Sequence, residues 1–156
     1  MAIALRPMRA AEFAAYVERL VPDYAAEISS NYDVLPEAAL AQARAEIDRD
    51  LHAGTNAPDH VLLCIVDEPS DTPIGYCWYR PDREARHVFV LDFQLIPKHR
   101  GKDYGKAALA ALADELAESG FDEIRLRVAA DNAVAQHVYL NSGFRPTGIN
   151  MSKRIG

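Results

Sequence analysis

The sequence contains only two cysteines and four lysines among 156 residues, and it lacks any long hydrophobic run. Two cysteines, Cys64 and Cys77, are too few for a disulfide scaffold. The longest apolar runs, Val61–Val66 and Ala107–Ala113, have six and seven residues, whereas a membrane-spanning helix needs about 20. The first residues also lack the apolar stretch of a signal peptide. We therefore expect a cytoplasmic protein with no membrane partner.

The composition that is present fits one globular domain. Apolar residues make up 49% of the chain and charged residues 26%, which is typical of a folded domain and excludes a disordered one. We expect a single domain over residues 1–156, without repeats or linkers. The five histidines show no metal-ligand spacing, and we therefore expect no metal.

Hydrophobic periodicity predicts two early helices followed by a series of strands. Residues 10–30 form a helical pattern that Pro22 kinks or divides in two, and Pro36 begins a second helix that ends at Leu51. The expected strands are 2–5, 60–67, 73–79, 88–95, 123–128 and 148–154, and the expected later helices are 102–119 and 132–142. This order predicts an α+β (mixed α/β) fold with one parallel crossover in its second half.

Charge is distributed unevenly along the chain, although the net charge is only −6. Residues 1–97 carry a net charge of −8 and residues 98–156 carry +2, and three of the four lysines fall within residues 98–106. Cations are unfavourable near a helix N-terminus, so a bound anion explains this cluster better than a solvated helix start does. The acidic remainder of the chain argues against a nucleic-acid partner.

A strand–turn–helix segment, FQLIPKHRGKDYGKAAL, carries this positive charge together with two glycines, Gly101 and Gly105. Glycines allow a close backbone approach, and the free N–H groups at a helix start bind phosphate. A P-loop is disfavoured because the spacing is one residue short and Ala107 replaces the hydroxyl that would hold Mg²⁺. The chain also lacks the Gly-x-Gly-x-x-Gly string of dinucleotide loops. An anion-binding module of another kind stays open as an alternative.

The segment Asp92–Lys106 resembles the cofactor loop of the GNAT superfamily of N-acetyltransferases. In that family the fourth strand ends in apolar residues and a proline, and an Arg/Gln-x-x-Gly-x-Gly loop begins a long helix. The match holds residue for residue except that Asp103 stands in place of the first glycine of the motif. The family brings backbone amides up to a pyrophosphate at this place. Asp tolerates a left-handed backbone better than most residues, so we expect a working loop.

A second segment, Leu126–Phe144, resembles the family pattern of a strand, an Asn, a short helix with Ala and Tyr, and a Gly-Phe pair. Asn132 and Tyr139 are seven residues apart, which is about two helical turns, so both lie near one helix face. Taken alone, the Asn is better explained as an N-cap and the Tyr as a core aromatic. The order of the two motifs along the chain favours the functional interpretation.

The resemblance implies a GNAT-like fold and an activity. The implied fold is a central, mostly antiparallel, twisted sheet of about 6–7 strands, splayed between the fourth and fifth strands and flanked by about four helices. Helices within residues 10–51 would lie on the acceptor side, and residues 60–156 would bind acetyl-CoA. The implied reaction moves an acetyl group from acetyl-CoA to a primary amine of a small molecule or protein, by direct attack in a ternary complex.

The resemblance also implies roles for residues of this chain. Tyr139 protonates the departing CoA thiolate, and the backbone N–H of Leu95 stabilises the oxyanion. Asp92 is the nearest acid that could serve as the base, although strand alternation places it on the face opposite Leu91 and Phe93. The residues implied in cofactor binding are Phe93, Gln94, Leu95, Arg100, Gly101, Lys102, Asp103, Tyr104, Gly105, Lys106 and Asn132.

The base and the acceptor are the least determined parts of this interpretation. Glu27, Glu84, His137 and a chain of water molecules are alternatives to Asp92 as the base. The net charge of −8 over residues 1–97 favours a cationic amine, bound by a monomer or a homodimer. A catalytically weak or inactive CoA-binding or sensing domain of the same fold is the alternative function.

Overall fold

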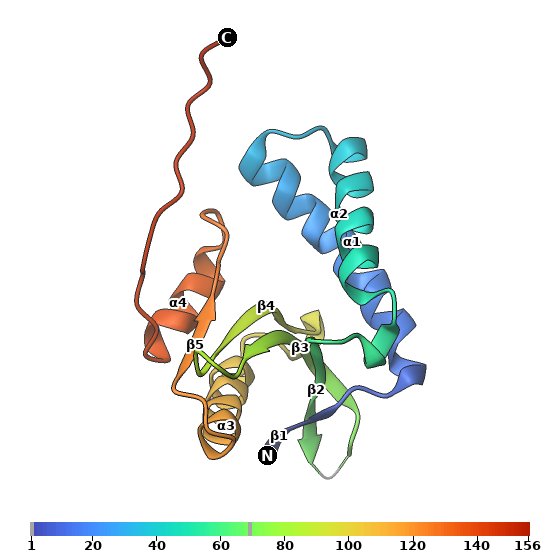
Figure 1. Ribbon diagram of the computed structural model, residues 1–156, viewed down its shortest axis with the longest axis vertical. Coiled ribbons are helices and arrows are strands. Elements are labelled where there is room, and N and C mark those ends of the chain that lie inside the picture. The colour runs from blue at the N-terminus through green and yellow to red at the C-terminus, as the bar shows by residue number, and fades with distance from the viewer. Residues whose placement is uncertain (1, 69) are drawn as a thin grey trace.

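The computed structural model describes residues 2–68 and 70–156, and Figure 1 shows how their helices and strands are arranged. The strands are β1 (Ala2–Pro7), β2 (Val61–Glu68), β3 (Pro73–Asp82), β4 (His87–Leu95) and β5 (Glu123–Leu126). The α-helices are α1 (Ala10–Tyr32), α2 (Pro36–Leu51), α3 (Tyr104–Glu118) and α4 (Ala133–Asn141). Short 3-10 helices cover Gly54–Asn56 and Pro97–His99. The mixed α+β fold predicted from the sequence is confirmed.

One sheet contains the five strands in the order β1-β2-β3-β4-β5. The first four strands pair antiparallel, and β4 pairs parallel with β5 across the α3 crossover. The prediction of six or seven strands is wrong, because the described residues form five. The strand expected over 148–154 is absent: residues 145–156 are exposed and pair with no strand of the sheet. These residues do not pair with the outer edge of β5, and an extended segment that pairs with no edge has no partner for its backbone groups.

Helices cover both faces of the sheet and form a core on each. On one face α1 and α2 pack against the sheet, and the core there contains Tyr16 and Trp78. On the other face α3 contributes Leu112 to a second core. Figure 1 shows α1 and α2 together on one side of the strands and α3 on the other. Cys64 lies in the first core and Cys77 in the second, both as free, buried thiols.

α1 runs as one helix through Pro22 rather than as two helices. A proline inside a helix removes one backbone hydrogen bond and clashes with the preceding turn. The buried side of α1 nevertheless continues across it, with Leu20 and Val21 before the proline and Ala25 and Ile28 after it. Most helical stability in proteins comes from packing of an apolar face, and this continuous face holds the helix together.

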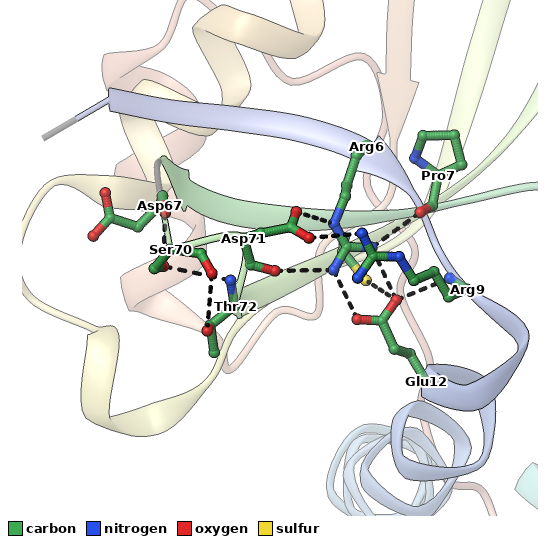
Figure 2. A network of polar contacts seen from close by, with 9 residues as sticks. Arg6, Pro7, Arg9, Glu12, Asp67, Ser70, Asp71 and Thr72 are labelled. Carbon is green, nitrogen blue, oxygen red and sulfur yellow. Dashed lines mark hydrogen bonds and ion pairs between the residues drawn. The ribbon is translucent and has the colours of Figure 1, made fainter.

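A network of ion pairs fastens the start of α1 to the edge of the sheet (Figure 2). The Arg6 guanidinium of β1 donates to both carboxylate oxygens of Glu12 at 2.9 and 2.8 Å and to Asp71 at 2.7 Å. Arg9 also donates to Asp71 at 2.6 Å, and its backbone N–H donates to Glu12 at 2.9 Å. The hydrogen bonds from the Arg6 side chain to the Glu12 carboxylate lower the pKa of Glu12 to about 2. The network thus joins β1, α1 and the β2–β3 turn.

Replacing Glu12 by Gln should lower the free energy of unfolding by about 1–3 kcal/mol at pH 7, because charged hydrogen bonds of a poorly exposed pair are lost. The folded-state pKa of Glu12 is depressed, so its contribution is complete above about pH 4.5 and disappears as the pH falls toward about 2. Urea unfolding at several pH values measures this difference. Glu18→Gln, on the exposed side of α1, is the matched control. An equal loss in the two variants would contradict the prediction.

Candidate active site

The second half of β4 is reoriented by one extra residue, Leu91. Val90 and Asp92 pair with successive residues of β3, so Leu91 has no partner in that strand. A β-bulge of this kind interrupts the alternation of side chains. Leu91 packs against the core beneath α1, and Asp92 bonds to a side chain of the same helix, whereas Phe93 packs on the α3 face. The expectation that Asp92 lies opposite Leu91 is therefore wrong, while its position opposite Phe93 is as predicted.

The sheet opens directly after this bulge. The pairing of β5 with β4 ends at Val90–Leu126, whereas β4 continues to Leu95. A cleft of about 100 Å³ lies where the two strands part. Residues of α1, β4, β5, α4 and the β5–α4 connection line this cleft, among them Glu27, Asp92, Phe93, Asn132 and Tyr139.

The backbone of β4 beyond the bulge faces this opening. Ile96 donates its N–H to the carbonyl of Ile74 in β3 at 2.8 Å. Because successive backbone groups of a strand point to opposite edges, the N–H groups of Phe93 and Leu95 point away from β3. They lie along the edge that β5 leaves uncovered. An extended ligand could pair with this edge as an added strand does.

Asp92 lies in the cleft with its carboxyl group held by two neighbours. The Tyr16 hydroxyl donates to Oδ2 of Asp92 at 2.7 Å, and Gln94 Nε2 donates to the same oxygen at 2.9 Å. Burial raises the pKa of Asp92 to about 6 in spite of these two hydrogen bonds, and the charges of Asp23 and Glu27 add to the rise. A carboxyl group with a pKa near neutrality is suited to accept a proton from a reacting group.

Tyr139 of α4 lines the same cleft. Its ring packs against Phe144, with 5.5 Å between the ring centroids. Burial raises the pKa of Tyr139 above its usual value, and the negative charges of Asp92 and Glu27 contribute. The hydroxyl therefore stays protonated at neutral pH and can donate a proton. The cleft thus combines one group suited to accept a proton with one suited to donate it.

The loop between β4 and α3 has the backbone shape of an anion site. Gly101 and Asp103 have φ of 77° and 61°, both in the left-handed region. The helix begins at Tyr104, two residues after the predicted start, because the left-handed Asp103 cannot be part of it. The Asp103 side chain makes no capping hydrogen bond, so it leaves the first N–H groups of α3 to other partners. The exposed side chains of Lys102 and Lys106 flank this helix start.

Not every residue of this loop presents its side chain to a ligand. The partly buried side chain of Tyr104 packs against the core beside β2 and β3. A Cβ atom on Gly105 would meet Leu95 and Val138 at 3.8 Å, an ordinary contact. The Arg100 side chain donates from Nε to the Leu95 carbonyl at 3.0 Å. Arg100 thus covers part of the backbone edge to which a ligand would bind.

The remaining candidate residues differ in whether they line the cleft. Asn132 accepts a hydrogen bond from the Ala135 N–H at 3.1 Å and is therefore the N-cap of α4, at the margin of the cleft. Glu27 also lines the cleft, where its carboxylate lies 3.6 Å from the Arg127 guanidinium. Neither Glu84 nor His137 lines it. Within the described part of the chain, no three His, Cys, Asp or Glu side chains gather as a metal site would require.

Comparisons with known proteins agree with this geometry. A profile of the Acetyltransferase (GNAT) family matches residues 22–144. The chain belongs to the GNAT family. It is 32% identical to YycN of Bacillus subtilis, named as an uncharacterized N-acetyltransferase, over 99% of this chain and all of that protein. The crystal structure of YycN superposes with a TM-score of 0.91, covering 99% of both chains.

Two further proteins are similar to this GNAT chain, one in part of its sequence and the other in its fold. Mycothiol acetyltransferase of Clavibacter sepedonicus is 36% identical over 96 residues, which are 62% of this chain and 31% of that protein. The PaiA N-acetyltransferase of Thermoplasma acidophilum, solved with coenzyme A, has a TM-score of 0.69 at 21% identity, over 96% of this chain and 94% of that one. This second likeness shows the fold alone.

Two residues that support the strands and side chains around this GNAT cleft escaped the sequence analysis. Tyr16 looks like any apolar residue of a helical stripe, and only its hydrogen bond to Asp92 shows that it holds a cleft residue. A Cβ atom on Gly75 would lie 2.4 Å from the Gln94 carbonyl oxygen, so this glycine lets β3 approach β4 beside Leu95. A glycine inside a strand is the signal that could have identified Gly75.

A search of the helices in residues 2–68 and 70–156 finds no candidate for a membrane span.

Proposed function

We propose that this GNAT protein transfers an acetyl group from acetyl-CoA to a primary amine, by direct attack in a ternary complex. The observation that carries the proposal is the pairing, in one cleft, of Asp92 with its raised pKa and the protonated Tyr139. Amine acetylation needs one group to take a proton from the amine and one to protonate the departing sulfur. We assign these roles to Asp92 and Tyr139, respectively.

The residues beside the cleft fit acetyl-CoA, which supplies the activated acetyl thioester. We assign the backbone of Phe93 and Leu95 to the amide-bearing arm of CoA, since both face the open edge of β4. We assign the pyrophosphate to residues 100–105 and the N-terminus of α3, with Lys102 and Lys106 contributing charge. The solved complex of a GNAT protein with coenzyme A supports this class of ligand.

Arg100 has two alternative partners in this proposal. Its Nε now donates to the Leu95 carbonyl at 3.0 Å, and a phosphate would offer it a stronger, charged acceptor. Moving Arg100 to the phosphate would uncover the Leu95 backbone for the CoA arm. The Leu95 N–H is then the group that we assign to the thioester oxygen as it gains negative charge.

The acceptor side of the cleft favours a cationic amine. Glu27 and Asp92 line the cleft together with Arg127, and Asp23 of α1 lies close enough to Asp92 to raise its pKa, so acids outnumber bases at this place. Acidic groups lining a cleft raise the local concentration of cations. We therefore propose one acetyltransferase unit over residues 1–156, in which α1 and α2 form the acceptor side. An inactive CoA-binding domain would not require Asp92 and Tyr139 to lie in the same cleft.

Replacing Tyr139 by Phe should lower kcat by about 10²–10⁴-fold, because the proton donor is removed. Packing of the ring against Phe144 is retained, so the Kd for CoA should stay unchanged. Release of free thiol from acetyl-CoA with a panel of amines measures the rate. Tyr79→Phe, which removes the same atom from a residue outside the cleft lining, should keep full activity. Full activity of Tyr139→Phe would contradict its role, and inactivity of the wild type on every amine would support a sensing domain.

The rate should depend on pH through Asp92. Below a pKa of about 6 the carboxyl group is protonated and cannot accept the amine proton, so kcat/KM should fall tenfold per pH unit from this step. Asp92→Asn should lower kcat by about 10²–10⁴-fold and remove this inflection, while titration of the amine at higher pH persists. Glu27→Gln is the parallel variant. If Glu27→Gln rather than Asp92→Asn abolishes the inflection, Glu27 is the base.

Asp103 is expected to weaken the binding of CoA by repelling its pyrophosphate. At about 4 Å in water such a repulsion is worth about 1 kcal/mol, so Asp103→Asn should bind CoA about fivefold more tightly. Asn also tolerates the left-handed backbone at this position. Isothermal titration with CoA measures the Kd, and Asp114→Asn on the exposed side of α3 is the control of equal charge. Weaker binding by Asp103→Asn would show that the carboxylate assists the loop.

A further inference from the structure

Tyr16 carries a polar group inside the core beneath α1. The residue is 0% exposed, and its hydroxyl donates to Oδ2 of Asp92 at 2.7 Å. Its ring packs against Tyr76 of β3, with 4.9 Å between the ring centroids. A buried hydroxyl costs free energy unless it is hydrogen-bonded, and a phenylalanine ring would fill the same space without that cost. The hydroxyl of Tyr16 therefore serves Asp92 rather than the packing of the core.

Both hydrogen bonds recorded for the Asp92 carboxyl group go to the same oxygen. Tyr16 and Gln94 donate to Oδ2 at 2.7 and 2.9 Å, and among the described residues no side chain donates to Oδ1. Within residues 2–68 and 70–156, the buried side-chain nitrogen and oxygen atoms that lack a partner belong to Asp67 and His87, so Oδ1 of Asp92 is not sealed in the interior. Because Asp92 lines the cleft, Oδ1 is the oxygen that opens to it.

Two separate constraints fix the position of this hydrogen bond. The network of Figure 2 holds Glu12 at the edge of the sheet through Arg6, and Tyr16 follows Glu12 by four residues on the same face of α1. The extra residue Leu91 brings Asp92 to this side of the sheet. The anchored helix and the bulged strand therefore meet at the Tyr16 hydroxyl.

The Tyr16 hydroxyl acts on Asp92 only as a hydrogen-bond donor. Burial raises the pKa of Tyr16 well above its usual value, and the charge of Asp92 adds to the rise. Tyr16 therefore stays protonated while Asp92 titrates, and its hydrogen bond favours the ionised carboxyl group. Burial raises the pKa of Asp92 to about 6, and the hydrogen bond from Tyr16 acts in the opposite direction. Without this donor the carboxyl group would ionise only at a higher pH.

Other titratable groups approach Asp92 from α1, β3, β5 and α4. They are Asp23, Glu27, Cys77, Arg127 and Tyr139. Burial raises the pKa of Cys77 and of Tyr139, so both stay protonated while Asp92 titrates. Burial also raises the pKa of Glu27. The titration of Glu27 is therefore the one that an experiment must separate from that of Asp92.

We propose that Tyr16 is a positioning residue for the acetyl transfer, whose hydroxyl holds Oδ2 of Asp92 so that Oδ1 faces the incoming amine. This inference rests on the proposed function, in which Asp92 takes the proton of the amine. Oδ1 accepts that proton as the nitrogen–carbon bond forms and the carbon–sulfur bond breaks, and the departing sulfur takes the proton of Tyr139. One proton returned from Asp92 to Tyr139 restores both groups. Tyr16 keeps its own proton throughout.

Replacing Tyr16 by Phe removes one oxygen atom and retains the packing of the ring against Tyr76. The Asp92 carboxyl group should then ionise about one to two pH units higher, because a hydrogen bond to a charged group is worth about that much in pKa. A ¹³C NMR titration of the Asp92 carboxyl carbon, assigned by its loss in Asp92→Asn, measures this shift in the free protein. An unchanged titration in Tyr16→Phe would overturn the proposal.

Two further variants complete the titration. Tyr76→Phe removes the hydroxyl from the other ring of the same pair, which has no bond to Asp92 in the described residues, and should leave the titration unchanged. Gln94→Met removes the second donor to Oδ2 from a partly buried position and should also raise the titration. The test therefore does not depend on the folding of one variant. An equal shift in Tyr76→Phe and Tyr16→Phe would assign the effect to packing and reject the role of the hydroxyl.

The rate of acetyl transfer separates positioning from structural support. In Tyr16→Phe the acid inflection of kcat/KM should move upward by the same one to two pH units, so the rate should fall about 10–100-fold below pH 6 and recover at higher pH. The Kd for CoA should stay unchanged. An equal loss of rate at every pH, with the inflection in place, would show a merely structural role and overturn the proposal.

Failure of the proposed function gives a different result. Full activity of Asp92→Asn over the whole pH range would reject Asp92 as the base, whatever Tyr16→Phe does. An inflection that Asp92→Asn removes but Tyr16→Phe leaves in place would reject only the positioning role of Tyr16. The two conclusions are therefore tested by different variants.

Discussion

The extra residue in β4 is the constraint on which the candidate site depends. If side chains alternated strictly through Leu91, Asp92 would share the face of Val90, away from α1, and could not bond to Tyr16. The pairing with β5 also stops where the bulge begins, at Val90. One inserted residue is thus accompanied by both the opening of the sheet and the reorientation of an acid toward that opening.

Burial has opposite chemical consequences for the two groups that share this opening. It makes the charged form of each less favourable, so the pKa of both Asp92 and Tyr139 rises. For the carboxyl group the rise brings the pKa close to neutrality, where proton uptake is possible. For the phenol it secures the protonated form. A single physical cause therefore produces, in one cleft, a group suited to accept a proton and a group suited to donate one.

Much of the layout could be predicted from local sequence patterns. The α+β order, the two early helices, the parallel crossover and the glycine-containing loop before α3 follow from periodicity, proline and glycine positions, and charge. Two errors share one origin. The sixth strand and the face of Asp92 both depend on which strand edge lies opposite, and local patterns carry no information about that edge. Tyr16 was missed for a related reason, because its partner lies 76 residues away.

The sequence by itself determined the family and the place of the candidate anion-binding loop, because two short motifs in the right order require particular residues at fixed spacing. It also determined that Asp103 occupies a glycine position, and the left-handed φ of 61° agrees with that substitution. Only the tertiary structure decided which acids line the cleft, which hydroxyl bonds to Asp92, and where residues 145–156 lie. These features arise from contacts between distant segments, whose free energy depends on burial and register rather than on the identity of neighbours along the chain.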